Sequence, residues 1–138
     1  MREILFRGKR TDRWNKGEWA EGYLKVYEGN AFVNINLDNP YGIQWAEVDS
    51  ETVGQFTEMT DKNGKRIFEG DIVKEGDIVR NGEIQIHGHI FSVVMRKGCW
   101  CVIPAHDTDE WDFLISYCPF LEVIGNIHDN PELLEVTE

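Results

Sequence analysis

EGDIVKEGDIV, residues 69–79, repeats a five-residue block on either side of Lys74. In each copy a glycine and an aspartate stand before an isoleucine and a valine. Glycine bends the backbone without steric cost, aspartate suits a turn, and β-branched residues favour the pleated surface of a strand. Each copy therefore predicts a turn that leads into a β-strand.

The repeat alone does not decide which copy pairs in a sheet. Because the copies are offset by six residues, Ile72 and Ile78 would share one face of a continuous strand, and a slip by one repeat would preserve the pattern. Asn81-Gly82 follows the second copy and is typical of a two-residue type I′ hairpin. This favours pairing of Ile78-Val79 across that turn, with the first copy as a lead-in or an edge segment.

Short strands and tight turns recur along the chain, so the expected fold class is mainly β with minor α. Residues 61–138 predict a meander that closes into a small SH3-like β-barrel, which removes exposed edges. An insertion at 104–118 is expected to form a loop or short helix. Asn130-Pro131-Glu132 predicts an N-cap and a terminal helix over 131–136. The meander strands are expected at 77–80, 83–87, 89–96, 99–103 and 121–125.

Residues 1–60 predict a β-rich N-terminal portion, which either stands as its own domain or joins the barrel portion in one compact unit. The first strand, around Ile4-Leu5-Phe6, is expected to end at Gly8. Asp49 is expected to cap a single helical turn. Further strands are expected at 19–27, 31–37 and 43–48, where apolar and polar residues alternate.

The composition indicates an acidic globular protein. The 138 residues include 14 Lys and Arg against 25 Asp and Glu, a net charge of −11, and 41% are hydrophobic. No apolar run approaches the roughly 20 residues that span a bilayer, and the start lacks a secretory signal, so a cytoplasmic protein without membrane contact is expected. Three cysteines cannot all pair within one chain, so no disulfide scaffold is expected.

The charges are unevenly distributed along the chain. Residues 1–16 hold six basic and two acidic residues, and no lysine or arginine follows Lys97. Such a surface repels nucleic acid phosphates except near the N-terminus.

Four segments resemble the YopX proteins of bacteriophages and prophages, in the same order and over nearly the whole chain. The resemblance implies a phage or prophage product with an SH3-like portion that acts in the bacterial cytoplasm. Because the family has no established biochemical function, it supplies no catalytic or ligand residues. The second EGDIV copy and residues 98–118 depart from the family pattern. The matching segments are ILFRGKRTD (4–12), GEWAEGYL (17–24), VGQFTEMTDKNGKRIFEGDIV (53–73) and LEVIGNIHDNPELLE (121–135).

Neither a metal site nor an active site is predicted. Cys99, Cys101, His106 and Cys118 have the residue types of a zinc site, but Cys-Trp-Cys lacks the usual knuckle spacing, and whether the four converge is left open. The acidic run at 107–112 is typical of a solvated loop. The sequence has no phosphate-binding glycine loop, zinc-protease motif or nucleophile elbow. We therefore predict a non-enzymatic protein without catalytic residues, metal or cofactor.

Two of the five tryptophans stand in strongly polar neighbourhoods, Trp14 in a basic one and Trp111 in an acidic one. The other three are expected in the core. Opposite charge around Trp14 and Trp111 suggests that the N-terminal arm of one subunit meets the acidic C-terminal region of another. The predicted interaction surface consists of Arg7, Lys9, Arg10, Arg13, Trp14, Asp109, Glu110, Trp111 and Asp112.

These observations favour a phage accessory protein that self-associates and binds an unidentified host or phage protein. One alternative is association with nucleic acid through the basic arm at Arg7-Gly8-Lys9-Arg10, which the overall charge opposes. Another is an acidic DNA-mimic inhibitor of a host protein, suggested by the stretch after Lys97.

Overall fold

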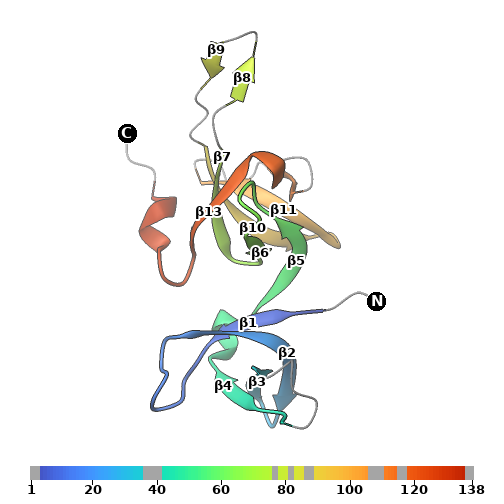
Figure 1. Cartoon of the computed structure of the whole chain (residues 1–138), viewed down its shortest axis with the longest axis vertical. Coiled ribbons are helices and arrows are strands. Elements are labelled where there is room, and N and C mark those ends of the chain that lie inside the picture. The colour runs from blue at the N-terminus through green and yellow to red at the C-terminus, as the bar shows by residue number, and fades with distance from the viewer. Residues whose placement is uncertain are drawn as a thin grey trace. The chain divides into compact units, whose positions relative to one another are not determined.

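Strands and short 3₁₀ turns make up the computed structural model, which describes residues 4–35, 42–75, 78–80, 83–85, 89–105, 111–114 and 118–135 (Figure 1). The predicted mainly β class is confirmed. The chain divides into two compact units, unit 1 (Met1–Phe56) and unit 2 (Thr57–Glu138). The sequence-based division into domains at residue 60 stays a prediction. No helix in the described ranges is long and apolar enough to cross a membrane.

Unit 1 is built on an antiparallel sheet in the order β4-β3-β2-β1, and Gly54 and Gln55 at the start of β5 pair with β1. The predicted strand over 19–27 is confirmed. The strands are β1 (Phe6–Lys9), β2 (Trp19–Tyr27), β3 (Asn30–Asn34), β4 (Trp45–Val48) and β5 (Gly54–Thr60).

The two edges of this sheet approach each other at an isolated bridge between Arg10 and Val48. There the N–H of Asp49 donates to the Lys9 carbonyl at 2.8 Å. Gly8 lies inside β1, so the prediction that it ends the first strand is wrong. A Cβ on Gly8 would lie 2.7 Å from Val48 Cγ2, so the residue is needed for close approach rather than for a turn.

The core of unit 1 contains mainly small side chains. Alternate residues of three strands point inward, as the period of a β-strand requires. Asp49 accepts a hydrogen bond from the Glu51 N–H at 3.0 Å and caps the 3₁₀ turn η1 (Ser50–Thr52), as predicted. The buried cluster consists of Ala20, Ala31, Val33, Ala46 and Val48.

Unit 2 contains a five-stranded antiparallel sheet in the order β12-β11-β10-β7-β13. Its inner strand β7 is the first EGDIV copy. Val73 pairs with both Phe91 and Val123, and Ile72 and Val73 are fully buried. The prediction that the first copy is a lead-in or an edge is therefore wrong. The strands are β7 (Asp71–Glu75), β10 (Ile90–Arg96), β11 (Cys99–Pro104), β12 (Asp112–Phe113) and β13 (Leu121–Asn126).

The second EGDIV copy forms a separate two-stranded hairpin of β8 (Ile78–Arg80) and β9 (Glu83–Gln85). Val79 pairs with Ile84, so the predicted pairing of the second copy is confirmed. The turn residues Asn81-Gly82 lie outside the described residues. Within the described strands β10 pairs with β7 instead of β9, so the hairpin interrupts the predicted meander.

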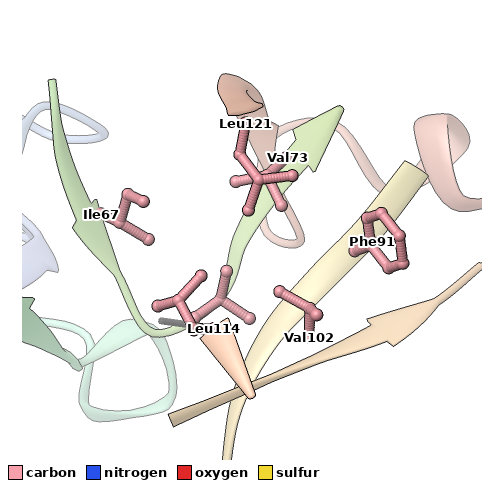
Figure 2. Close-up of a cluster of buried hydrophobic side chains, with 7 residues drawn as sticks. Ile67, Val73, Phe91, Val102, Leu114 and Leu121 are labelled. Atoms are coloured by element: carbon pink, nitrogen blue, oxygen red, sulfur yellow. The ribbon is translucent and has the colours of Figure 1, made fainter. Parts of the chain in front are cut away.

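The core of unit 2 gathers apolar side chains from the sheet, from β6 (Arg66–Phe68) and from Leu114, and Figure 2 shows them directed toward one another. In the described part of unit 2 the edge strands β12 and β13 do not pair with each other, so the sheet is open. The SH3-like closed barrel is therefore not confirmed. The cluster consists of Ile67, Val73, Phe91, Val93, Val102, Leu114 and Leu121.

The end of the chain forms one 3₁₀ turn, η4 (Pro131–Leu134), where a helix over 131–136 was predicted. Residue 136 lies outside the described residues. Asn130 stands at the N-cap position, but its Oδ1 accepts from the Asn126 N–H at 3.3 Å and does not cap the turn. In the predicted insertion at 104–118, the described part contains β12, and the turn η3 (Cys118–Phe120) follows.

Candidate interaction surface on unit 1

Large aromatic and basic side chains line the outer face of the unit 1 sheet. Residues directly opposite in an antiparallel ladder share a face. The register places Tyr23 in one row with Trp45 and Lys25 in the next row with Phe32. Lys9 lies opposite Trp19. We call this surface the ring-and-cation face, and it consists of Arg7, Lys9, Trp19, Tyr23, Lys25, Phe32 and Trp45.

The cations of this face are held against its rings. The Arg7 guanidinium carbon lies 4.7 Å from the centroid of the Trp19 ring, and Lys9 Nζ lies 5.8 Å from it. Lys25 Nζ lies 4.4 Å from the Trp45 centroid and 5.3 Å from the Phe32 centroid. Each such contact is worth about 0.5–1 kcal/mol at an exposed site. The positive charges therefore have defined positions on the sheet.

The rings remain accessible although unit 1 has few large side chains in its core. Tyr23 is 44% exposed and Trp45 is 36% exposed, whereas Ala20, Ala31 and Ala46 are buried. Folding preferentially buries large apolar groups, because their burial contributes the most stabilising free energy per residue. The exposed rings of Tyr23 and Trp45 make this side of the sheet a candidate contact surface.

The loop between β1 and β2 adds a further ring and cation. Trp14 is 82% exposed, and the Arg13 guanidinium carbon lies 5.1 Å from its ring centroid. Arg10 donates to Asp12 from Nε at 2.7 Å and from Nη2 at 3.3 Å. The hydrogen bond from Arg10, followed by that from Asn15, lowers the pKa of Asp12. The charge of Arg10 is thus compensated locally, while Arg13 is held on Trp14.

The predicted interaction surface is divided between the two units. Arg7 and Lys9 lie on β1, and Arg10, Arg13 and Trp14 lie in the loop that joins β1 to β2, so these residues belong to a folded strand and its connecting loop rather than to an arm. Trp111 and Asp112 lie at β12 in unit 2, where Trp111 packs edge-on against Phe113 with centroids 5.5 Å apart. Asp109 and Glu110 lie outside the described residues.

Sequence reasoning missed most of the ring-and-cation face. It assigned Trp19, Trp45 and Trp100 to the core, whereas Trp45 is exposed and the other two are half-buried. The alternation in WAEGYLKVY, residues 19–27, could have revealed the face. Its small or aliphatic positions form one side of the strand, and its rings and charges form the other.

Cys99 and Cys101 occupy one face of β11 in very different surroundings. Cys99 is exposed, whereas Cys101 is buried and its Sγ donates to the Cys99 carbonyl at 3.5 Å. Burial, with a smaller effect from Cys99, raises the pKa of the Cys101 thiol. His106 lies outside the described residues, and no group of three or more metal-ligating side chains occurs within the described ones.

Alkylation should distinguish the two thiols. Because the thiolate is the reactive form, iodoacetamide should modify Cys99 in the folded protein about tenfold or more faster than Cys101. Fragment-ion mass spectrometry can separate them, since Trp100 lies between them. In urea, as the control, the two thiols should react at equal rates. Equal rates in the folded protein as well would contradict the burial of Cys101.

The family model for the YopX protein matches residues 6–135. The chain belongs to the YopX family. Its fold is similar to the crystal structure of protein EF1440 from Enterococcus faecalis, with 25% identity, a TM-score of 0.53, and coverage of 96% of this chain and 98% of that one. None of the curated proteins matches the sequence.

Several polar residues in the YopX segments serve the fold. Asp61 is buried, and its carboxylate accepts the N–H groups of Asn63 and Lys65 through Oδ1 and of Val123 through Oδ2, each at 2.9 Å. Asn126 Oδ1 accepts from the N–H groups of the two turn residues His128 and Asp129. The segments that carry the YopX resemblance therefore include side chains that fix turns and join strands in unit 2.

Proposed function

We propose that the protein is a non-enzymatic phage or prophage accessory protein that acts in the bacterial cytoplasm by binding another macromolecule. The contact surface is the ring-and-cation face. The observation that supports it is that unit 1 exposes the large rings of Tyr23 and Trp45 and buries alanines in its core. Aromatic side chains and arginine dominate the energetics of protein contact patches.

The non-enzymatic part of the proposal is supported by what the buried polar groups do. The Asp61 carboxylate accepts hydrogen bonds from three backbone N–H groups, and the side-chain carbonyl oxygen of Asn126 accepts from two. Asp71, which is also buried, accepts the Phe68 N–H at 2.7 Å. Catalytic carboxylates, by contrast, must be within reach of a substrate.

The test is affinity capture from host lysate with the protein and a variant that combines Tyr23→Ser and Trp45→Ser. Bound proteins and nucleic acids are both identified. The wild type should retain discrete species that the variant loses. The matched control is Phe120→Ser, because Phe120 is also an exposed ring, at 49%, but lies in unit 2. An identical captured set for the wild type and the double variant would contradict the proposal.

We also propose that the protein self-associates, with the loop around Trp14 in one copy meeting the acidic region around Trp111 in another. Unit 1 holds seven basic and nine acidic residues, whereas unit 2 holds seven and 16. The six basic and three acidic residues in 6–27 give β1, β2 and their loop a positive charge. Complementary charges steer association and weaken with salt.

Light scattering should therefore show a dimer in low salt. The dimer should dissociate in about 1 M salt, where the attraction between charges extends over only a few ångströms. Trp14→Ser should weaken the dimer, because it removes an 82% exposed ring, whereas Ile43→Ser, at 65% exposure in the same unit, should not. A monomer at every protein and salt concentration would rule out self-association.

A further inference from the structure

The ring-and-cation face repeats one chemical unit along β2. Trp19 carries Arg7 and Lys9 over its ring, and six residues further along the strand Lys25 lies over Phe32 and Trp45. Tyr23 lies between these two groups, in the row of Trp45. Six residues of strand span about 20 Å. The face thus offers planar rings and positive charges over that length, with the acidic Glu21, opposite Arg7, between Trp19 and Tyr23.

We propose that the ligand of this face is a single-stranded nucleic acid, an inference that rests on the proposed function and names its partner. A single strand repeats a planar base and a phosphate, so each base can stack on a ring while a neighbouring phosphate meets a cation. Proteins that bind single strands without sequence preference combine these two features. About four nucleotides fit the length of the face, at the lower end of known site sizes.

An acidic protein partner matches the face less completely. The carboxylates of an acidic partner would attract the positive charges of this face, but they carry no aromatic rings to stack on the exposed rings of Tyr23 and Trp45. A duplex is also a poorer match, because its bases are stacked inside and cannot lie on the rings. The combination of rings and cations is what selects the single strand.

The charges of the face make the affinity for a single strand depend on the salt concentration. With about three phosphates neutralised, the logarithm of the affinity for a single strand should fall with the logarithm of salt at a slope of about −2. Affinity should therefore drop about 20-fold between 50 and 200 mM salt. Glu21, opposite Arg7, lies on the same face and opposes phosphate. So does Glu47, opposite Phe32. Replacing it with a cation should strengthen binding.

The experiment measures fluorescence anisotropy of labelled oligothymidylate of about 20 nucleotides with the full chain, beside a duplex and a polyglutamate peptide of equal length. The single strand should bind more tightly than either comparator. Tyr23→Ala and Trp45→Ala should each weaken it about fivefold or more. Phe120→Ala, the ring control in unit 2, and Lys62→Ala, the exposed-lysine control, should change it less than about twofold. Glu47→Lys should tighten it, a gain that misfolding cannot mimic.

Absence of single-strand binding at low salt would overturn the inference. So would polyglutamate bound equally tightly with no effect of the two ring substitutions. Either result leaves the proposed function intact if the Tyr23 and Trp45 double variant still loses captured macromolecules. The proposed function falls only if that capture is also unchanged.

Discussion

Asp61→Ala is expected to lower the free energy of unfolding by about 3–5 kcal/mol, because the substitution leaves three backbone N–H groups without their carboxylate acceptor. Two of these groups hold the turn after β5, and the third belongs to Val123 on β13. The Lys62 N–H also donates to the Leu121 carbonyl at 2.9 Å. The turn therefore covers the outer edge of β13, and its loss should expose that edge.

Urea denaturation measures the effect. Lys62→Ala is the matched control in the same turn, because Lys62 is exposed and its 3.8 Å contact with Glu122 is a surface ion pair worth at most about 1 kcal/mol. A loss below about 1 kcal/mol for Asp61→Ala would show that the turn satisfies its N–H groups in another way.

The same carboxylate makes stability depend on pH. Burial acts to raise the pKa of Asp61, but the hydrogen bonds from Val123, Lys65 and Asn63 outweigh it and hold the pKa below its ordinary value of 3.8. The stabilisation is present above that value and disappears as pH falls through the lower pKa of the folded state. The difference between wild type and Asp61→Ala should therefore shrink below about pH 3.8 and stay constant at neutral pH.

Gly22→Ala is the second substitution with a large expected effect, a loss of at least about 3 kcal/mol in the stability of unit 1. A Cβ on Gly22 would overlap the carbonyl oxygen of Asn34, which is backbone and cannot rotate away. Gly22 precedes Tyr23, the partner of Asn34 in the ladder of β2 and β3. The substitution should therefore part these strands.

Hydrogen exchange read by mass spectrometry should show faster exchange across β2 and β3 in Gly22→Ala, with β7 and β10 unchanged. Gly29→Ala separates crowding from backbone strain, because nothing lies within 4 Å of its Cβ while its φ is +81°. It should cost about 1–2 kcal/mol. Equal losses for both variants would mean that crowding at Asn34 is not the cause.

Local patterns in the sequence predicted local structure well. Alternation predicted β2 over 19–27, Asn81-Gly82 predicted the pairing of Ile78-Val79, and Asp49 predicted the cap of η1. The choice of sheet neighbours depends on contacts between distant residues, which no local pattern records. The prediction for the first EGDIV copy was wrong for this reason, since both partners of β7 come from later in the chain.

The candidate site was only partly predictable. The basic character of the N-terminal residues identified Arg7, Lys9 and Trp14. Tryptophan as a residue type did not identify the site, because it occurs both in cores and on binding surfaces. The position of Trp45 on the outer face follows from its pairing with Asn34, which lies on the neighbouring strand β3. Gly8 was expected to end the first strand, because only the folded chain brings Val48 against it.

Binding at the ring-and-cation face is tested most directly with the indole N–H signals of the five tryptophans in a ¹⁵N–¹H spectrum, each assigned by substitution. Oligothymidylate is added at low salt. If the ring-and-cation face binds single strands, the signals of Trp19 and Trp45 should shift with added ligand, while those of Trp100 and Trp111, in unit 2, should stay in place. Unchanged Trp19 and Trp45 signals, or shifts confined to Trp111, would contradict it.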